Sequence, residues 1–161
     1  MFEIIFDFGH YITHRLVHTK YLYPYIHKTH HKYKEVLSIH AFHHNAMDLI
    51  ITNSIPFITS SYILRNLMSN KLIHLILVYK IFLEISGHSG RITNSSCFTQ
   101  CILLPKLLGI SLNVQDHDFH HLKTNCNYSK RFSLFDKLFG TYKKYEVKEL
   151  KTTNKNVDLK K

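Results

Sequence analysis

The chain has 161 residues, which suits a single domain, and 21 Lys+Arg against 11 Asp+Glu give it a formal net charge of +10. That balance is typical of proteins that contact an anionic surface, either nucleic acid or phospholipid. Nucleic acid is disfavoured as a partner because the sequence lacks a zinc-finger spacing, an RNP-like strand and an aromatic–basic β pattern. The three cysteines include no CxxC pair, so neither a disulfide framework nor a zinc ribbon is indicated.

Apolar residues at three-to-four spacing predict a helix from residue 1 to about residue 23, which Pro24 is expected to break. A second, short helix is expected over residues 38–48. The next two segments, 47–68 and 71–86, are mostly apolar and are joined by a short polar turn, which predicts a helical hairpin.

Hydropathy leaves two arrangements of this hairpin open, since neither segment offers 18 uninterrupted apolar residues. The pair either enters the bilayer, with Pro56 kinking the first helix, or is buried in a soluble helical bundle. After it come a Gly/Ser/Thr/Asn loop (87–100), an apolar connector (101–116) and an aromatic, basic segment. The sequence thus predicts an all-α fold with residues 1–142 as the domain and residues 143–161 as a basic, flexible tail.

Histidine is the most unusual feature of the composition, with 14 residues. Residues 14–18 form an H-x3-H motif, and residues 27–31 and 117–121 each form an H-x2-HH motif. Side chains four residues apart lie on one face of a helix, so both histidines of such a pair can point at one metal ion. Two copies of H-x2-HH in one short chain indicate a metal site and not scattered surface residues.

Eight or nine neutral imidazoles exceed what one ion can hold, so the motifs favour two ions, and imidazole suits iron, zinc and copper. His88 lies between the second and third motifs. Glu84, His40 and His44 are further candidate ligands or, with Asp48, groups that fix the imidazole tautomers. Asp7, Asp118 and Asp136 are expected to support the site or the fold. His10, His43 and His74 are expected to be ordinary surface or core residues.

These motifs, in this order, resemble the three histidine boxes of the fatty acid hydroxylase/sterol desaturase superfamily. The neighbouring residues are similar too: Asp7, Tyr11-x2-His14-Arg15, Leu22-Tyr23, Ile26-His27-Lys28, His88-Ser89-Gly90, Asn127-Tyr128 and the segment 135–142. The resemblance covers residues 7 to 142 and is most specific in its last stretch.

The resemblance implies a membrane oxygenase that hydroxylates or desaturates a sterol, a fatty acyl chain or a related lipid. It would use O2 and two iron ions, or zinc as the resident ion, with electrons from cytochrome b5 and its NAD(P)H-dependent reductase. The implied metal ligands are His14, His18, His27, His30, His31, His88, His117, His120 and His121.

The implied location is the endoplasmic reticulum membrane, with the histidine boxes in a helical cap on the cytosolic side of the membrane hairpin. Basic residues near the boxes agree with that side and could attract an acidic electron donor or anionic headgroups: Arg15, Lys20, Lys28, Lys32, Lys34, Lys123, Lys130 and Arg131. A homo-oligomer is compatible with the sequence.

Family members usually carry a further pair of membrane helices before the first box, whereas this sequence begins shortly before Asp7. We therefore expect an N-terminally short domain. This departure leaves a second interpretation open, in which the chain is a catalytically inactive relative that binds metal and acts as a membrane interaction protein.

Overall fold

The computed structural model describes residues 1–34, 37–89 and 103–144. All regular elements within these residues are helical, apart from an isolated antiparallel bridge between Ser111 and Phe132, so the all-α prediction is confirmed. The elements are α1 (Phe2–Val17), α2 (Tyr23–Ile26), 3-10 turns at His30–Lys32 and Ser38–His40, α3 (Ala46–Leu49), a π-helical turn (Ile50–Ser54), α4 (Ile55–Ile63), α5 (Asn70–Gly87), α6 (Leu103–Leu107), α7 (Val114–Lys123) and α8 (Leu134–Leu138).

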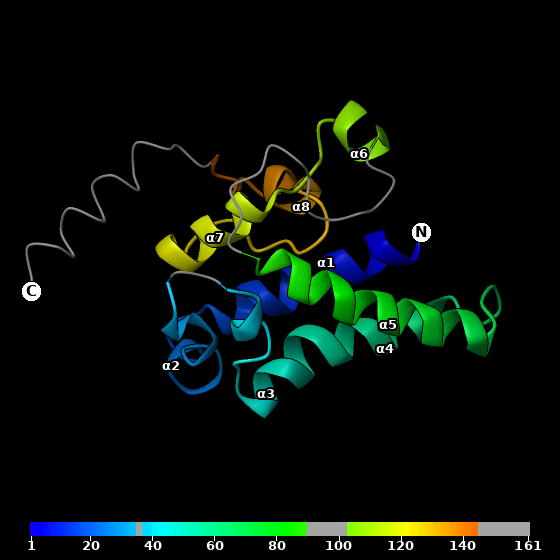
Figure 1. Ribbon diagram of the computed structural model, residues 1–161, viewed down its shortest axis with the longest axis horizontal. Helices are drawn as coiled ribbons and strands as arrows, with labels where there is room; N and C mark the ends of the chain where they lie inside the picture. The colour runs from blue at the N-terminus through cyan, green and yellow to red at the C-terminus, as the bar shows by residue number, and fades with distance from the viewer. Residues whose placement is uncertain (35–36, 90–102, 145–161) are drawn as a thin grey trace, which may run out of the picture.

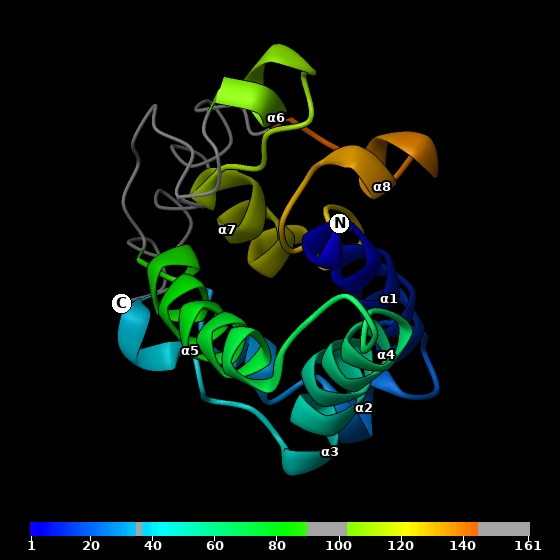
Figure 2. The ribbon, with the colours of Figure 1, turned by 90° about the vertical axis from the view of Figure 1, so that its right-hand side faces the viewer.

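The long helices run side by side, and the short α2 and α3 gather with α7 at one end of them (Figure 1). Seen along their length, α1, α4, α5 and α7 surround a common interior (Figure 2). No helix of the described ranges is both long enough and apolar enough to cross a bilayer. Most of the expected basic tail, from residue 145 onward, lies outside the described residues.

The first helix is shorter than its sequence pattern predicts. α1 ends at Val17, and a run of turns over residues 18–22 replaces the expected last turns of the helix. Pro24 lies in the first turn of α2. Backbone N–H groups there have no intrahelical partner, so the missing N–H of proline costs no hydrogen bond. The proline therefore begins a new helix, and the turns before it fold the second histidine box back against the first.

α1 packs chiefly against α4, and one glycine makes the close approach possible. A Cβ added at Gly9 would lie 3.3 Å from the Cβ of Pro56, tighter than ordinary packing. At the far end of the same contact, Phe2, Phe6 and Leu64 form a buried apolar cluster. The two helices therefore pack against each other both at Gly9 and at the N-terminal end of α1.

The predicted kink at Pro56 takes the form of a π-helical turn just before it. Pro56 has no N–H to donate to the carbonyl of Thr52 four residues earlier. This oxygen instead accepts a hydrogen bond from Nδ1 of His10 at 2.6 Å. The π-helical turn (Ile50–Ser54) therefore joins α3–α4 to the interior next to the first histidine box. Pi-helical turns of this kind are often found at functional sites.

The prediction of a helix over residues 38–48 is wrong. The segment forms a 3-10 turn (Ser38–His40), further turns and then α3, which begins at Ala46. Asn45 caps α3 by accepting the backbone N–H of Met47 at 2.9 Å, so the helix starts after His44 and not before it. His40 consequently stacks on Tyr33, with ring centroids 3.9 Å apart.

Two buried carboxylates hold the segment that follows α7. Asp7 accepts the backbone N–H groups of Lys130, Arg131 and Phe132 at 2.8, 2.8 and 3.0 Å. Asp136 accepts the backbone N–H groups of Tyr128 and Ser129, both at 2.8 Å. Residues 128–132 have few backbone partners of their own, so Asp7 ties this segment to α1 and Asp136 ties it to α8.

Replacing Asp7 by alanine removes a fully buried carboxylate and leaves three backbone N–H groups without their hydrogen-bond acceptor. We expect Asp7→Ala to lower the free energy of unfolding by about 3 kcal/mol or more, because hydrogen bonds to a charged acceptor are strong and their buried donors are left unpaired. Thermal unfolding of the detergent-purified chain would measure this. Ile12→Ala on the exposed face of the same helix is the control, and an equal effect of both variants would contradict the role assigned to Asp7.

Candidate metal centre

Nine histidines from four distant parts of the chain meet in the interior as two groups. The five-histidine group consists of His14, His18, His27, His31 and His120, and the four-histidine group of His30, His88, His117 and His121. Within each group, one ring nitrogen of every member lies within 4.8 Å of the others. The groups adjoin each other, since the ring centroids of His31 and His121 are 4.5 Å apart.

Each H-x2-HH box contributes to both groups. His27 and His31, four residues apart, belong to the five-histidine group, whereas His30 belongs to the four-histidine group. In the third box the pair four residues apart, His117 and His121, joins the four-histidine group and His120 joins the other. Neighbouring side chains diverge around a helix, so the two adjacent histidines of a box face different groups. The boxes thereby hold the two groups together.

The arrangement fits metal ions better than it fits hydrogen bonding. Nε2 of His14 lies 3.0 Å from Nε2 of His27, and the Nε2 atoms of His117 and His88 are 3.1 Å apart. Two ligands with bonds of about 2.1 Å that meet at roughly 90–100° would have this separation. In the described part of the chain, buried ring nitrogens of His18, His30 and His120 have no hydrogen-bond partner. Buried polar atoms rarely lack one, so these nitrogens are suited to bind a cation.

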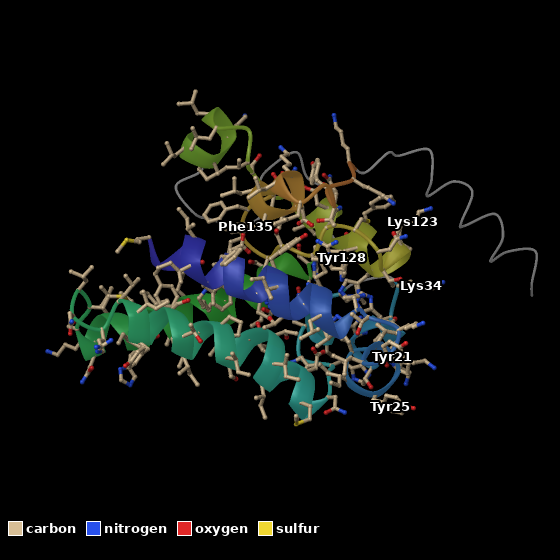
Figure 3. The ribbon with its side chains drawn as sticks, turned by 180° about the vertical axis from the view of Figure 1, so that it is seen from behind. Tyr21, Tyr25, Lys34, Lys123, Tyr128 and Phe135 are labelled. Carbon is tan, nitrogen blue, oxygen red and sulfur yellow. The ribbon has the colours of Figure 1, made fainter. Side chains whose placement is uncertain are left out.

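Hydrogen bonds on the opposite ring nitrogen orient several of these imidazoles. Nδ1 of His14 donates to the Tyr128 carbonyl at 2.7 Å, and Nδ1 of His120 donates to the Cys126 carbonyl at 2.7 Å. Nδ1 of His27 donates to Oδ1 of Asp48 at 2.8 Å. Each bond places the hydrogen on Nδ1 and leaves the lone pair of Nε2 directed into the group, as in known metal sites. Figure 3 shows Tyr128 between α1 and α7.

Burial favours the neutral form of most of these imidazoles, and this is the form that binds metal. It is the largest cause that lowers their pKa, and the neighbouring imidazoles lower it further for His14, His18, His30, His31, His117 and His121. Burial also lowers the pKa of His120 to about 3, although the hydrogen bond to the Cys126 carbonyl opposes that shift. The groups thus present uncharged nitrogen donors at neutral pH.

The further candidate ligands lie outside both groups. Glu84 forms an ion pair with Lys130, and one of its carboxylate oxygens is 3.7 Å from Nδ1 of His88. His44 lies beside the four-histidine group, with its ring centroid 6.3 Å from that of His30. Asp118 also stays outside the groups, and burial raises its pKa to about 7.

The structure also shows supporting groups that the sequence did not indicate. The carbonyls of Tyr128 and Cys126 are backbone atoms, which no side-chain pattern can reveal. Lys130 and Arg131 were expected among the basic residues near the boxes that would attract an acidic partner. Both are buried, with 8% and 2% of their surface exposed, so they cannot serve as part of such a surface.

The profile of the fatty acid hydroxylase family matches residues 1–141. The chain belongs to the fatty acid hydroxylase family. This match covers all nine histidines, and in this family member their two groups form a cluster that could hold metal.

Several curated relatives are similar over most of the chain. It is 29% identical to methylsterol monooxygenase 1 of Gallus gallus, over 94% of this chain and 51% of that protein. A putative methylsterol monooxygenase of Dictyostelium discoideum is 33% identical, over 95% and 54%. The C-4 methylsterol oxidase of Schizosaccharomyces pombe is 27% identical, over 90% and 47%. The chain thus spans about half the length of these relatives, and no solved structure matches it.

The two groups allow separate predictions of how substitutions change the metal content of the protein. We expect two ions per chain. His117→Ala should weaken or abolish binding of the ion in the four-histidine group and His31→Ala that of the other, because each variant removes a ligand from one group and leaves the other group complete. Elemental analysis of detergent-purified protein measures this. His74→Ala, on the exposed surface of α5, is the control and should keep both ions. Wild-type protein without bound metal would contradict the assignment.

Proposed function

We propose that this fatty acid hydroxylase family member is a di-metal oxygenase that hydroxylates or desaturates a lipid with O2. The observation that supports it most is the convergence of nine imidazoles in two adjoining groups. An all-nitrogen ligand set suits iron, with zinc as the other candidate for the resident ion. Two bound iron ions would supply the activation of O2 that the attack on an unactivated C–H bond requires.

In this proposal the protein binds the ions through oriented ligands, limits the access of water to them and binds the lipid next to them. All nine histidines act as ligands, and the carbonyls of Tyr128 and Cys126 and the carboxylate of Asp48 keep their rings in the orientation that ligation needs. Close packing around the groups limits the access of water, which would otherwise divert a reactive oxidant. An adjoining cavity would hold the lipid.

A cavity of about 400 Å³ lies between α4 and α5 and reaches toward the histidine groups. Phe6, Leu49, Phe57, Leu77 and Ile81 are among the residues that line it, and they make it largely apolar. Its volume is in the range of small-molecule sites. The names of the relatives point to methylated sterols and the family name points to fatty acids, and an apolar cavity is suited to either class.

We further propose that the chain lies in the endoplasmic reticulum membrane, with the histidine groups at the cytosolic side. Large apolar side chains are exposed along α4 and α5, among them Ile58, Ile63, Leu75, Val78 and Phe82, and a lipid surface would cover them. α2 and α7, which adjoin the second box and carry the third, lie at the end of this pair that is remote from its connecting turn (Figure 1).

Basic side chains surround that end of the molecule. Lys34 and Lys123 project outward near the second and third boxes (Figure 3), and Arg15, Lys20, Lys28 and Lys32 are exposed as well. Such a surface favours an acidic electron donor, for which cytochrome b5 with its NAD(P)H reductase is the proposed partner. Self-association into a homo-oligomer is compatible with this arrangement.

Expression of the chain in a host cell tests the oxygenase directly. We expect lipid mass spectrometry to show a lipid that has gained one oxygen atom or lost two hydrogens, with the oxygen labelled when the cells grow under isotopic O2. His30→Ala and His120→Ala should abolish the product because each removes a ligand from one group, and His74→Ala should retain it. An unchanged lipid profile from wild-type protein with both ions bound would favour the catalytically inactive relative instead.

A further inference from the structure

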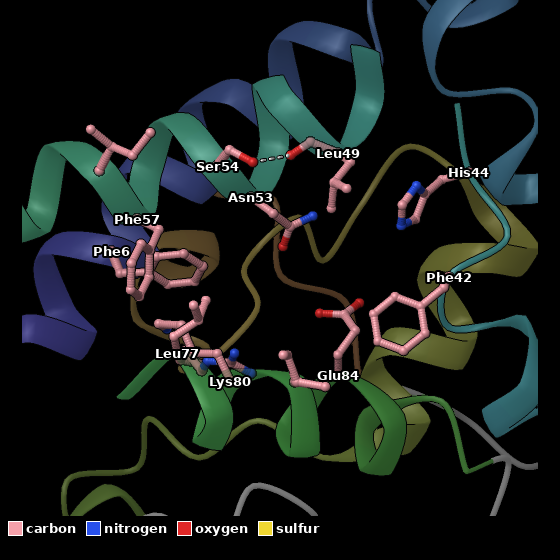
Figure 4. Close-up of a pocket in the computed structure, with 13 residues that line it drawn as sticks. Phe6, Phe42, His44, Leu49, Asn53, Ser54, Phe57, Leu77, Lys80 and Glu84 are labelled. Atoms are coloured by element: carbon pink, nitrogen blue, oxygen red, sulfur yellow. Dashed lines mark hydrogen bonds between the residues drawn. The ribbon is translucent and has the colours of Figure 1, made fainter. Parts of the chain in front are cut away.

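A polar cluster separates the apolar cavity from the histidine groups. Asn53, from the π-helical turn, and Glu84, from α5, point into the cavity from opposite walls (Figure 4). The same two residues also line a small cavity of about 20 Å³ whose other walls include His14, His30 and His117. Asn53 and Glu84, together with His44, therefore form the boundary between the apolar cavity and the histidines.

Lys130 connects these two residues. Its ammonium donates to Oδ1 of Asn53 at 2.7 Å and forms the ion pair with Glu84. Its backbone N–H is one of the three that Asp7 accepts, so the position of this lysine is fixed at both ends. Lys130 is buried and lines the small cavity beside the histidines. We name Asn53, Glu84 and Lys130 the polar gate.

The polar gate has the chemistry to bind a neutral hydroxyl group. An ammonium carries three N–H donors, of which Asn53 and Glu84 accept two among the described residues, so one remains for a ligand. The Glu84 carboxylate has several lone pairs and can accept a ligand O–H. A hydroxyl both accepts and donates, so it complements the pair. A ligand carboxylate would be repelled by the like charge of Glu84 and would therefore bind more weakly than a hydroxyl.

We propose that the polar gate binds the hydroxyl of a sterol substrate and thereby selects the carbon that is oxidised. This inference rests on the proposed oxygenase function. Lys130 and Glu84 line a narrow space shared with His88 and His117. A hydroxyl held there brings the carbons nearest to it to the four-histidine group, and the rest of the sterol occupies the apolar cavity. Oxidation is then directed to a substituent beside the hydroxyl-bearing carbon, such as a C-4 methyl group, and away from the distant side chain.

Equilibrium binding to the full chain in detergent tests the gate without any turnover. The probes are a C-4 methylsterol with a free hydroxyl and the methyl ether of that hydroxyl, which can accept a hydrogen bond but cannot donate one. We expect wild-type protein to bind the free sterol at least about tenfold more tightly, the value of one hydrogen bond to a charged group. Equal binding of the two probes would overturn the proposal.

The matched variant is the double substitution Lys130→Met with Glu84→Met, which removes both charges together and so leaves neither buried and unpaired. It should bind both probes with similar affinity. Lys80→Met is the control, because Lys80 lines the same cavity but pairs with Glu3, and Glu3 keeps its contact with Arg131. The control should keep the wild-type preference, and a preference that survives in the double variant would overturn the proposal. All proteins are measured before and after chelation, so that metal loss is not mistaken for loss of the gate.

The position of oxidation separates this inference from the function on which it rests. Oxidation of a lipid only at carbons remote from any hydroxyl would contradict the gate and leave the oxygenase proposal standing. A protein that prefers the free sterol, as the gate requires, but oxidises no lipid would support the gate and contradict the oxygenase.

Discussion

Ring nitrogens of nine buried and half-buried imidazoles face one another across a few ångströms, and the rest of the structure is arranged to keep them there. Ring nitrogens only 3.0 Å apart, as in His14 and His27, repel unless a proton or a metal ion lies between them. Protons are disfavoured because burial lowers the pKa of most of these imidazoles, so a metal cation is the partner that these nitrogens fit. Asp7, Asp48 and the Tyr128 carbonyl hold the surrounding chain and rings against that repulsion.

Histidines four residues apart in a box fall in the same group because residues four apart share a helix face wherever the backbone is helical, as it is across His117 and His121. Their role as metal ligands stays a prediction. His44 and Asp48 are also four residues apart, but they do not share a helix face. Residues 38–48 are not one helix, so Asp48 turns to His27 instead. The contact between Lys130 and Asn53 joins residues 77 positions apart, and only the packing of α1 against the π-helical turn and the C-terminal segment brings them together. Local sequence patterns carry no information on such a contact.

The irregular part of the longest hydrophobic segment is the part that contacts the candidate metal centre. The π-helical turn before Pro56 leaves the Thr52 carbonyl for His10 and directs Asn53 toward Lys130. A regular helix would have given neither contact at these positions. Asp7 contributes from the other side, since its carboxylate fixes the backbone of Lys130. The same few residues therefore serve the stability of the fold, the position of the histidines and the boundary of the cavity.

X-ray absorption at the iron edge tests the central claim most directly, namely that imidazoles from both groups surround two adjacent ions. Iron-loaded protein should show a first shell of nitrogen and oxygen scatterers at about 2.1 Å, the multiple scattering of imidazole rings and a metal–metal path. The metal–metal path should disappear in His117→Ala, which keeps the five-histidine group. A first shell containing thiolate sulfur, or a spectrum of wild-type protein without imidazole or metal–metal scattering, would contradict the account.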